Sequence, residues 1–381
     1  MSNKSHHGNR KRLKERPANG EIMKQFALVG KGINLILKDN VLAVISEKPL
    51  STISSAFYNG GGLKDTKAIL NVEVIKSCTD QYLHENPETC ILDSSKTFGL
   101  DESFIGMVTA AAVKNFSLVS KKDDEMAISV IATAADDEGN TCNFAESAGE
   151  KITIEPSEGT INVIIVIDGN PTESCLEGIM ITATEAKMAA LRELDIRSRF
   201  SGDEATGTVT DAVVVAKTNR GDSIAYGGPA SKLGQLVGNC TRKAVKEAIT
   251  KANEFMPSRS VKERLREGHM PIEKLAFELS KVNDLRISSQ RLTKILETEP
   301  LFASLILAAV KMDSDVKKGL IPYELGNIEA VSESFGNLLS KTDHGQEIPV
   351  GRELKNKYAS VDLPPFTKNV LINIVKRALS A

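Results

Sequence analysis

A lysine on the apolar side of a predicted helix is the first side chain in the sequence that is suited to chemistry. Apolar residues recur at steps of three and four through the predicted helix Ser174–Ile196. Lys187 falls on this stripe, four residues after Ala183 and four before Leu191. A buried amine is costly unless it is paired or loses its proton, so Lys187 is a candidate to donate a proton or orient a substrate. A lysine that snorkels to the rim of the core is the alternative. Glu185 lies on a neighbouring face and is either a catalytic carboxylate or a solvated one.

The threonine-rich segment after this helix is the second candidate, and we expect it to be a strand buried on both faces. Alternation places Thr206, Thr208 and Thr210 on one face and Asp211 on the other. A carboxylate that enters an apolar strand needs a partner, and Lys187 can supply it. Threonine also favours strands, so a purely structural ladder is the alternative. Because the two faces line one pocket wall only if the strand ends or bulges, either the threonines or Asp211 contacts a substrate directly.

Two glycine-containing turns can present backbone N–H groups to an oxygen atom. They are Asn59-Gly-Gly-Gly62 and Gly159-Thr-Ile-Asn162. A run of glycines is not readily held in a helix, so the first segment is predicted to be a loop. Backbone N–H groups in such loops bind anionic or carbonyl oxygens, although ordinary turns are more common.

Several familiar catalytic and metal-binding patterns are missing from the sequence. His84 is the only histidine between residues 21 and 256, so histidine triads and histidine metal clusters are not expected there. The five cysteines are far apart and include no CxxC pair, which predicts ordinary thiols. The sequence has no GxSxG, no GxxxxGK[ST] and no GxGxxG that opens a helix. Acid–base work therefore has to come from carboxylate, lysine and hydroxyl groups, with no metal site in this domain.

The composition, with 41% hydrophobic and 26% charged residues among 381, is that of a globular protein. Six basic residues and one acid lie in residues 1–20, which we expect to be a solvated, disordered tail. The rest of the chain is mildly acidic, so nucleic-acid binding is not expected. No apolar run approaches the roughly 18–20 residues that span a bilayer. The N-terminus lacks the apolar core of a signal peptide, so a cytoplasmic protein is expected.

The predicted elements between residues 21 and 256 indicate an α+β domain, a mixed α/β sandwich, because strands dominate its first half and helices flank the later strands. The predicted strands are Phe26–Gly30, Ile33–Leu37, Val41–Ser46, Ile69–Ile75, Met126–Thr133, Ile161–Asp168 and Gly207–Lys217. The predicted helices are Asp101–Val113, Ser174–Ile196 and Ser231–Phe255, and residues 135–149 are predicted to be a loop.

A smaller all-α domain is predicted for residues 257–381, after a change of composition at Pro257. Single prolines and the pair Pro364-Pro365 separate its helical stretches. The predicted helices are Val261–Glu267, Ile272–Val282, Ser288–Glu297, Leu301–Asp313, Asn327–Ser340 and Thr367–Leu379.

The first domain resembles the adenosylcobinamide amidohydrolases of archaeal cobamide salvage. The resemblance follows the chain in order over about 235 residues, and the helix that contains Thr184-Glu-Ala-Lys187 followed by the threonine-rich segment is its most specific part. One segment departs from the family pattern, because this chain has Thr133-Ala-Ala-Asp-Asp137 and then Cys142-Asn-Phe144. The matching segments are Pro49-Leu-Ser-Thr-Ile-Ser-Ser-Ala56, Asn59-Gly-Gly61, Gly106-Met-Val-Thr-Ala110, Gly159-Thr-Ile-Asn162, Ala183-Thr-Glu-Ala-Lys-Met-Ala-Ala-Leu191, Ala205-Thr-Gly-Thr-Val-Thr-Asp211, Gly228-Pro229 and Leu233-Gly234.

The resemblance implies hydrolysis of the amide between aminopropanol and the corrin propionyl side chain, with a corrinoid as the partner molecule. No cofactor is implied, because the cobalt arrives with the substrate. We expect Asp211 or Glu185 to act as the base, Lys187 to donate or orient, and Thr208 to position water or attack. Backbone groups around Gly60 and Gly61 would stabilise the oxyanion. The expected substrate-binding residues are Ser54, Ser55, Asn59, Gly60, Gly61, Thr109, Asn162, Thr206 and Thr210.

The second domain shows a fainter resemblance, to phosphatidylglycerophosphatase A-like domains, which include archaeal α-ribazole-phosphate phosphatases. It rests on Lys262-Glu-Arg-Leu-Arg-Glu-Gly268, Ile272-Glu-Lys-Leu-Ala276, Lys311-Met-Asp313 and Lys318-Gly-Leu320. A terminal acidic element reads Phe366-Thr-Lys-Asn369 here, and the loss of two carboxylates weakens Mg²⁺ binding. We expect an accessory or degenerate domain, with Mg²⁺ relevant only if the domain is active.

Two other functions are compatible with the same residues. One is a corrinoid-binding or scaffold protein that does not hydrolyse its ligand. The other is an acyl transferase with a threonine nucleophile, because a threonine-rich strand beside a helix suits that chemistry. The oligomeric state does not follow from the sequence.

Overall fold

The chain forms two compact units, Met1–Pro257 and Ser258–Ala381. The structure is a computed structural model that describes residues 23–74, 86–101, 103–123, 126–135, 160–208, 210–252, 258–321, 328–336 and 358–380. Some predictions fall outside these residues: the tail 1–20, most of the loop 135–149, His84, Gly159, Cys78 and Cys142.

A nine-stranded mixed sheet organises the first unit. Its strands follow the order β1-β2-β3-β10-β8-β7-β6, while β4 pairs with β3 and β5 pairs with β4. β8 and β10 are parallel neighbours, flanked by the antiparallel strands β7 and β3. The strands are β1 (Lys24–Ala27), β2 (Ile33–Lys38), β3 (Val41–Ser54), β4 (Gly61–Glu73), β5 (Phe104–Thr109), β6 (Ser117–Lys122), β7 (Ala127–Ala135), β8 (Thr160–Asp168) and β10 (Ala212–Lys217). A separate pair is formed by β9 (Asn170–Pro171) and β11 (Ser223–Ile224).

The long strand β3 belongs to both halves of the sheet. Its first part pairs with β2 and its last part with β10, and its register with β4 shifts between Ile45 and Leu50. Such irregularities bend a strand. The two halves enclose one apolar core, which takes side chains of β2, β3, β4 and β5 from one half and of β7, β8 and β10 from the other.

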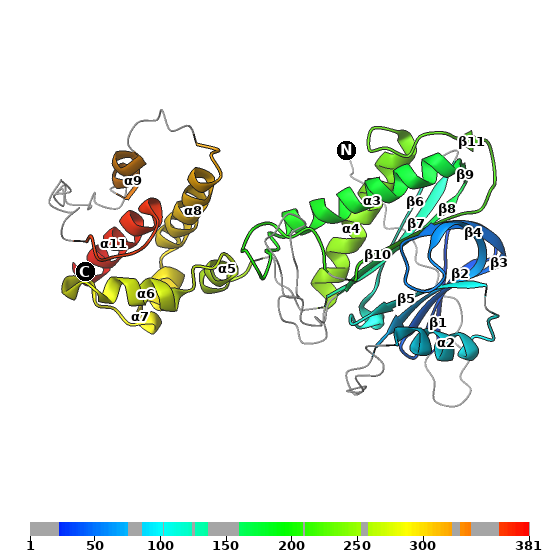
Figure 1. Ribbon diagram of the computed structural model, residues 1–381, viewed down its shortest axis with the longest axis horizontal. Coiled ribbons are helices and arrows are strands. Elements are labelled where there is room, and N and C mark those ends of the chain that lie inside the picture. Colours follow the sequence, from blue (N-terminus) through cyan, green and yellow to red (C-terminus); the bar gives the residue numbers. More distant parts are fainter. Residues whose placement is uncertain are drawn as a thin grey trace, which may run out of the picture. The chain divides into compact units, whose positions relative to one another are not determined.

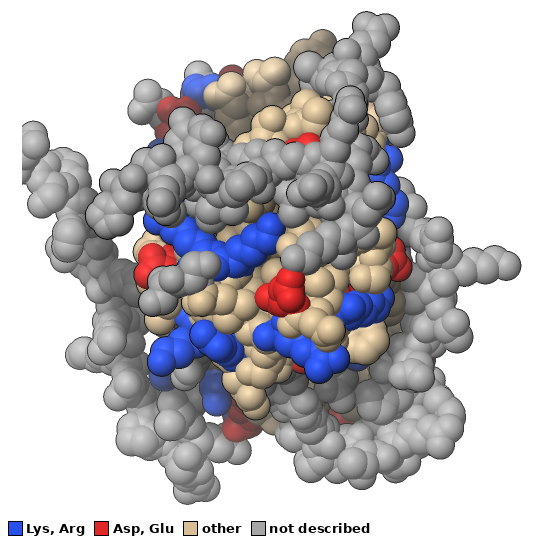
Figure 2. All heavy atoms as spheres, turned by 90° about the vertical axis from the view of Figure 1, so that its left-hand side faces the viewer, with Lys and Arg blue, Asp and Glu red and all other residues tan. Residues whose placement is uncertain are grey.

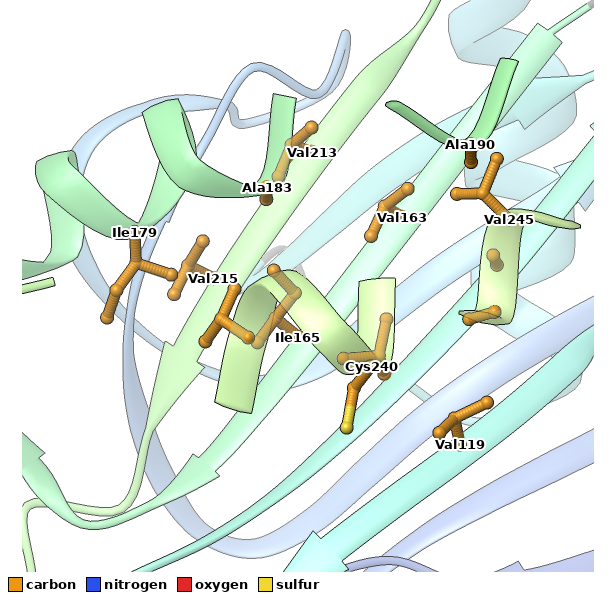
Figure 3. Close-up of a cluster of buried hydrophobic side chains, with 14 of the residues drawn as sticks. Val119, Val163, Ile165, Ile179, Ala183, Ala190, Val213, Val215, Cys240 and Val245 are labelled. Atoms are coloured by element: carbon orange, nitrogen blue, oxygen red, sulfur yellow. The ribbon is translucent and has the colours of Figure 1, made fainter. Parts of the chain in front are cut away.

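Helices cover the outer faces of this curled sheet (Figure 1). Helices α3 and α4 pack on the half that contains β10, β8, β7 and β6, and α2 packs on β4 and β5. Figure 3 shows Ala183 of α3 and Cys240 of α4 among the side chains of β8 and β10. The predicted mixed α/β sandwich is therefore confirmed. The helices of this unit are α2 (Pro87–Thr97), the 3-10 helix η1 (Val113–Asn115), α3 (Glu173–Glu193) and α4 (Lys232–Ala252).

The predicted helix Asp101–Val113 is wrong, because strand β5 (Phe104–Thr109) occupies the middle of this range. Phe104 packs against the α2 side of the sheet, and the next residue, Ile105, packs in the core between the sheet halves. A short strand that is buried on both faces has no alternating pattern. Hydrophobicity alone therefore does not distinguish it from a buried helix.

The second unit is helical, as predicted, and has its own apolar core. The face shown in Figure 2 carries several groups of Lys and Arg side chains with acidic side chains among them. None of the helices within the described ranges is long and apolar enough to cross a membrane. The helices of this unit are α5 (Val261–Glu267), α6 (Ile272–Ser280), η2 (Asn283–Leu285), α7 (Ser289–Thr298), α8 (Pro300–Lys317), α9 (Ile328–Gly336) and α11 (Pro365–Ser380).

Candidate active site

The buried ion pair between Lys187 and Asp211 is the centre of the candidate site. Lys187 projects from α3, Asp211 immediately precedes β10, and their side chains are only 9% and 13% exposed. The Lys187 ammonium donates a hydrogen bond to Oδ2 of Asp211. Because α3 packs its apolar stripe against β10, the lysine on that stripe meets the carboxylate at the start of the strand. The pairing predicted from the sequence is confirmed.

Asp211 also fixes the turn that precedes β10. Its Oδ1 accepts hydrogen bonds from the Thr208 hydroxyl at 2.5 Å and from Ile161 N at 2.9 Å, and its Oδ2 accepts one from Thr208 N at 3.2 Å. Local bonds of this kind compete with strand formation. The predicted strand Gly207–Lys217 therefore begins only at Ala212. The prediction that Thr208 and Asp211 lie on opposite strand faces is wrong, since the structure joins the two side chains directly.

Gly207 is a site residue that the sequence analysis did not single out. A Cβ atom at this position would lie 2.4 Å from Oδ2 of Asp211 and 2.8 Å from Nζ of Lys187, which is far too close. Only a residue without a side chain therefore leaves room for the ion pair beside this turn. A glycine inside a predicted strand often marks such a close approach, so the sequence did contain a signal.

The remaining candidates near this turn differ in their surroundings. The hydroxyls of Thr210 and Thr160 are hydrogen-bonded to each other at 2.7 Å, and Thr206 is half-buried. Glu185 on α3 is exposed, and its side chain forms no hydrogen bond or ion pair with any residue that the structure describes. The structure thus brings Lys187 and Thr208 to Asp211, and it does not bring Glu185 there.

A second polar cluster lies in the core between the two halves of the sheet. The Asn162 amide donates to Asn71 Oδ1 at 2.8 Å and to the Val108 carbonyl at 2.9 Å, and its Oδ1 accepts from Ala212 N at 3.2 Å. Asn71 in turn donates to the Thr133 hydroxyl at 2.8 Å. Asn162 and Asn71 are each 1% exposed, so this network is closed to a large substrate. Because this network includes the backbone N–H of Ala212, it reaches the residue that directly follows Asp211 in the chain.

Thr109 lies at the end of β5, in the same interior. It is 1% exposed, and its hydroxyl accepts a hydrogen bond from Ala111 N at 3.0 Å. Among the predicted substrate-binding residues, Thr109 and Asn162 are therefore enclosed by protein. Asn71 was not predicted as a site residue, because an asparagine within a predicted strand is equally compatible with an exposed position.

The loop between β3 and β4 contains the other predicted substrate-binding residues. Ser55 is exposed, and it forms two bonds with Val213 of β10: Ser55 N donates to the Val213 carbonyl, and Val213 N donates to Ser55 Oγ, both at 3.0 Å. Ser54 is buried, and its hydroxyl accepts from Ala56 N at 2.8 Å. The structure therefore exposes the Ser55 hydroxyl beside the strand that Asp211 precedes, whereas Ser54 stabilises the loop.

The Asn59-Gly60-Gly61 segment forms a tight turn in this loop. Asn59 and Gly61 have positive φ angles of 54° and 107°. A Cβ atom on Gly60 would lie 2.0 Å from the Ala56 carbonyl oxygen, which explains the glycine at that position. Lys64 holds the turn by donating hydrogen bonds to the carbonyls of Asn59 and Gly60 at 3.1 and 2.7 Å.

The described cysteines behave as ordinary thiols. Cys90, Cys175 and Cys240 are free, and burial raises the pKa of the Cys175 and Cys240 thiols. A raised pKa keeps a thiol protonated and therefore unreactive. Within the described ranges, no three His, Cys, Asp or Glu side chains are grouped so that they could hold a metal ion.

The fold and the first cluster together define a class of protein. A threonine hydroxyl, a carboxylate and an ammonium group are in hydrogen-bond contact at the start of a strand in an α/β sandwich. These are the groups that nucleophilic and acid–base hydrolysis requires when no histidine is present.

Comparison with known sequences identifies the family. The profile of the adenosylcobinamide amidohydrolase family matches residues 29–257, more than half of the chain. An adenosylcobinamide amidohydrolase from Methanosarcina mazei is 31% identical over 196 residues, covering 50% of this chain and 82% of that protein. An uncharacterized protein from Methanocaldococcus jannaschii is 28% identical over 211 residues, covering 51% and 81%. The chain therefore belongs to the adenosylcobinamide amidohydrolase family, and it is an amide hydrolase.

Two solved structures show a weaker likeness. A protein from Pyrococcus horikoshii OT3 has a TM-score of 0.29 and 14% identity, over 61% of this chain and 82% of that chain. The L-aminopeptidase D-Ala-esterase/amidase from Ochrobactrum anthropi has a TM-score of 0.28 and 12% identity over the same shares. Likenesses at this level carry no argument about activity.

Proposed function

We propose that the chain hydrolyses the amide that joins aminopropanol to the corrin propionyl side chain of adenosylcobinamide, releasing adenosylcobyric acid and aminopropanol. The observation that carries the proposal is the Thr208 hydroxyl hydrogen-bonded to the buried Asp211–Lys187 pair, within the part of the chain that matches the family. The cobalt is part of the substrate, and no further cofactor is proposed.

In the proposed first step, Thr208 Oγ attacks the amide carbonyl while its proton passes to Asp211, 2.5 Å away. Collapse of the tetrahedral intermediate breaks the C–N bond, and Lys187 gives a proton to the leaving amine. The proton on Asp211 then passes to Lys187 through their hydrogen bond, which restores the ion pair. Backbone N–H groups around Gly60 and Gly61 are proposed to stabilise the oxyanion.

In the proposed second step, water hydrolyses the ester on Thr208. Asp211 accepts a proton from the attacking water, and that proton returns to Thr208 Oγ as the C–O bond breaks. The Ser55 hydroxyl is proposed to bind a substrate oxygen, because it is exposed and its own oxygen already accepts a bond from Val213 N. Thr206 and Thr210 are proposed to line the same side of the site.

The direct test is incubation of the purified full chain with adenosylcobinamide, followed by separation of the corrinoid products and assay of free aminopropanol. We expect both products, and we expect Asp211→Asn to reduce kcat by about 1,000-fold or more, because the proton acceptor is lost. Glu185→Gln is the matched control and should turn over normally. Near-normal turnover by Asp211→Asn, or tight binding without cleavage by the wild type, contradicts the proposal.

Acyl transfer is the second candidate, and the Thr208–Asp211 hydrogen bond favours it as much as hydrolysis. A covalent ester on Thr208 would be detected as a mass increase of the peptide that contains it after rapid acid quenching. Products formed only when an amine or alcohol acceptor is added would establish a transferase. Absence of the ester together with full activity of Thr208→Val would leave water as the attacking group and remove Thr208 as the nucleophile.

For the helical unit we propose an accessory role without phosphatase activity. Its Asp313 carboxylate accepts hydrogen bonds from Phe366 N at 2.9 Å and Thr367 N at 2.8 Å, so it caps the start of α11. Burial raises the pKa of Asp313, which disfavours the anion that a divalent metal needs. Phosphate release from α-ribazole phosphate with Mg²⁺ would overturn this proposal.

A further inference from the structure

We infer that Phe57 is a specificity-determining residue, an aromatic platform at the rim of the active site on which the apolar face of the corrin ring packs. The inference rests on the proposed function. Phe57 is 58% exposed, although its neighbour Ala56 is buried and the next residue, Tyr58, stacks on Phe104 with a centroid distance of 5.0 Å. Exposure alone does not distinguish Phe57 from other exposed apolar residues, and its position in the loop beside the reacting groups carries the inference.

The strand register places the loop that carries Phe57 beside the reacting groups. Ser54 pairs with Val214 in the antiparallel ladder of β3 and β10, and the pairing continues through the two Ser55–Val213 hydrogen bonds. If the pairing continued beyond Ser55 and Val213, Ala56 would lie opposite Ala212 and the next residue would lie opposite Asp211. Adjacent strands are about 4.8 Å apart. The loop therefore extends from the end of the sheet at which the candidate site is built.

The loop is also held rigidly. Tyr58 and Gly106 exchange two backbone hydrogen bonds of 3.0 Å, and the Asn59 side chain donates to the Phe104 carbonyl at 3.0 Å. On the other side of Phe57 the backbone at Gly60 passes so near the Ala56 carbonyl that a Cβ atom there would lie 2.0 Å from its oxygen. An aromatic side chain on an ordered backbone has only two χ angles to fix, so it loses little conformational entropy on binding.

The chemistry of the substrate class fits this position. The reacting amide lies on a side chain of a wide, conjugated macrocycle that carries many methyl groups. When the amide carbonyl reaches Thr208, the body of the macrocycle has to lie outside the buried ion pair, at the rim. An aromatic ring there contacts the macrocycle and makes no contact with a small amide, so it distinguishes corrinoids from other amides.

The test compares Phe57→Ala with variants of two aromatic residues that are more exposed than Phe57, Tyr226→Ala and Phe277→Ala, which are 79% and 63% exposed in the wild type. We expect Phe57→Ala to raise KM for adenosylcobinamide by about tenfold, equal to about 1.4 kcal/mol of lost contact, with kcat and the unfolding midpoint unchanged. Phe57→Trp should retain the wild-type KM, and the two controls should be normal.

Binding is measured separately in the Asp211→Asn background, where turnover does not obscure the dissociation constant. Adding Phe57→Ala to that background should weaken adenosylcobinamide binding to the same extent. An unchanged dissociation constant and an unchanged KM overturn the inference while leaving the hydrolase proposal intact. The opposite outcome is that the wild type binds adenosylcobinamide, with an affinity that depends on Phe57, but does not cleave it. That outcome overturns the proposed hydrolase activity and supports the role of Phe57 in binding.

Discussion

Asp211 is surrounded by the Lys187 ammonium, the Thr208 hydroxyl and the backbone N–H groups of Thr208 and Ile161. These donors hold the carboxylate in one orientation, which keeps the Thr208 hydroxyl and the lysine on its two different oxygens. The proposed nucleophile, Thr208, and the proposed proton donor, Lys187, are thereby held in place by the fold, and such preorganisation is a large part of catalytic rate enhancement. The same crowding leaves no room for a side chain at position 207 unless the ion pair moves.

Gly207→Ala is therefore expected to damage catalysis more than stability. The added methyl group would lie 2.4 Å from Asp211 Oδ2, so the carboxylate has to move away from Thr208 or Lys187. Gly207 does not have a positive φ, so alanine brings no backbone strain of its own. We expect kcat/KM to fall by about 100-fold, or about 2.7 kcal/mol in transition-state free energy.

The control for this variant is Gly238→Ala in α4, where the new methyl group meets its nearest neighbour, Thr182 Cγ2, at an ordinary 3.8 Å. Steady-state kinetics and thermal unfolding of both variants provide the comparison. Equal activity in the two variants would mean that the ion pair tolerates displacement and that its geometry is not required for turnover.

The Lys187–Asp211 pair was predicted from the sequence because each charge interrupts an apolar pattern. Buried charges are stable only when they are paired, and these two lie on neighbouring elements. It did not predict the contact between Thr208 and Asp211. Threonine favours strands, and strict alternation separates positions 208 and 211, so the pattern pointed to one continuous strand. A turn closed by side-chain bonds leaves no periodic signal.

At the scale of elements, one buried polar cluster lies on each side of the sheet where β8 and β10 begin. Lys187 reaches Asp211 from the helical side, whereas Asn162 and Asn71 lie in the core between the sheet halves. The two clusters meet at Ala212 N, which bonds to Asn162 Oδ1 at 3.2 Å. The buried network therefore fixes the first residue of β10 and, through it, the backbone of Asp211.

Asn71→Leu tests this positioning role. Leucine has a similar size but cannot accept the bond from Asn162, so the start of β10 is held less firmly. We expect kcat to fall by about tenfold with KM unchanged, and the unfolding free energy to fall by about 1–3 kcal/mol because buried polar partners are left unpaired. The pH dependence of kcat should also shift, since displacement of Asp211 changes its contact with Lys187.

Thr66→Val is the matched control, because Thr66 also lies buried on β4 but bonds to the Ala68 and Ser103 carbonyls, away from Ala212. This variant should lose stability while keeping the wild-type kcat and pH profile. If Asn71→Leu behaves in the same way, the asparagine network supports the fold only. Thr133→Val, which removes the far end of the network, gives a milder second variant for the same measurement.

Helices and strands were predicted correctly where the spacing of apolar residues distinguishes a helix from a strand. The long helices α3 and α4 show apolar stripes, and β8 is apolar from Ile161 to Ile167 apart from Asn162, so their types agree with the sequence predictions. Strand β5 was missed because six residues buried on both faces carry no period. The bend in β3 was missed as well, since the register shift between Ile45 and Leu50 depends on pairing with β4 rather than on local sequence.

At the scale of the whole molecule, the two units have separate apolar cores, and every residue of the candidate site belongs to the first. In the second unit, Glu278 of α6 is 7% exposed and accepts hydrogen bonds from Lys281 Nζ and from Asp362 N at 2.6 Å. Burial acts to raise the pKa of Glu278, but these donors outweigh it, so the pKa lies below its ordinary value. Glu278 thus links α6 to the segment that precedes α11.

A lowered pKa in the folded state gives a defined sign to the pH dependence of stability. The contribution of ionised Glu278 is fully present above its unfolded pKa, near 4.5, and is lost as the pH falls through the lower folded value. Glu278→Gln should therefore lower the unfolding free energy of the helical unit by about 1–3 kcal/mol at pH 7, and the difference from wild type should shrink below about pH 4.

Hydrogen exchange of the α6 amides, measured from pH 7 downward by rapid-quench methods, would locate this effect in the second unit. Glu273→Gln is the control, because Glu273 lies exposed on the same helix. Amide hydrolysis at neutral pH should be unaffected in both variants, since no residue of the candidate site lies in this unit. A stability difference that stays constant with pH would show that the hydrogen bonds, and not the charge of Glu278, provide the link; loss of hydrolysis in a folded Glu278→Gln protein would show that the second unit takes part in the reaction.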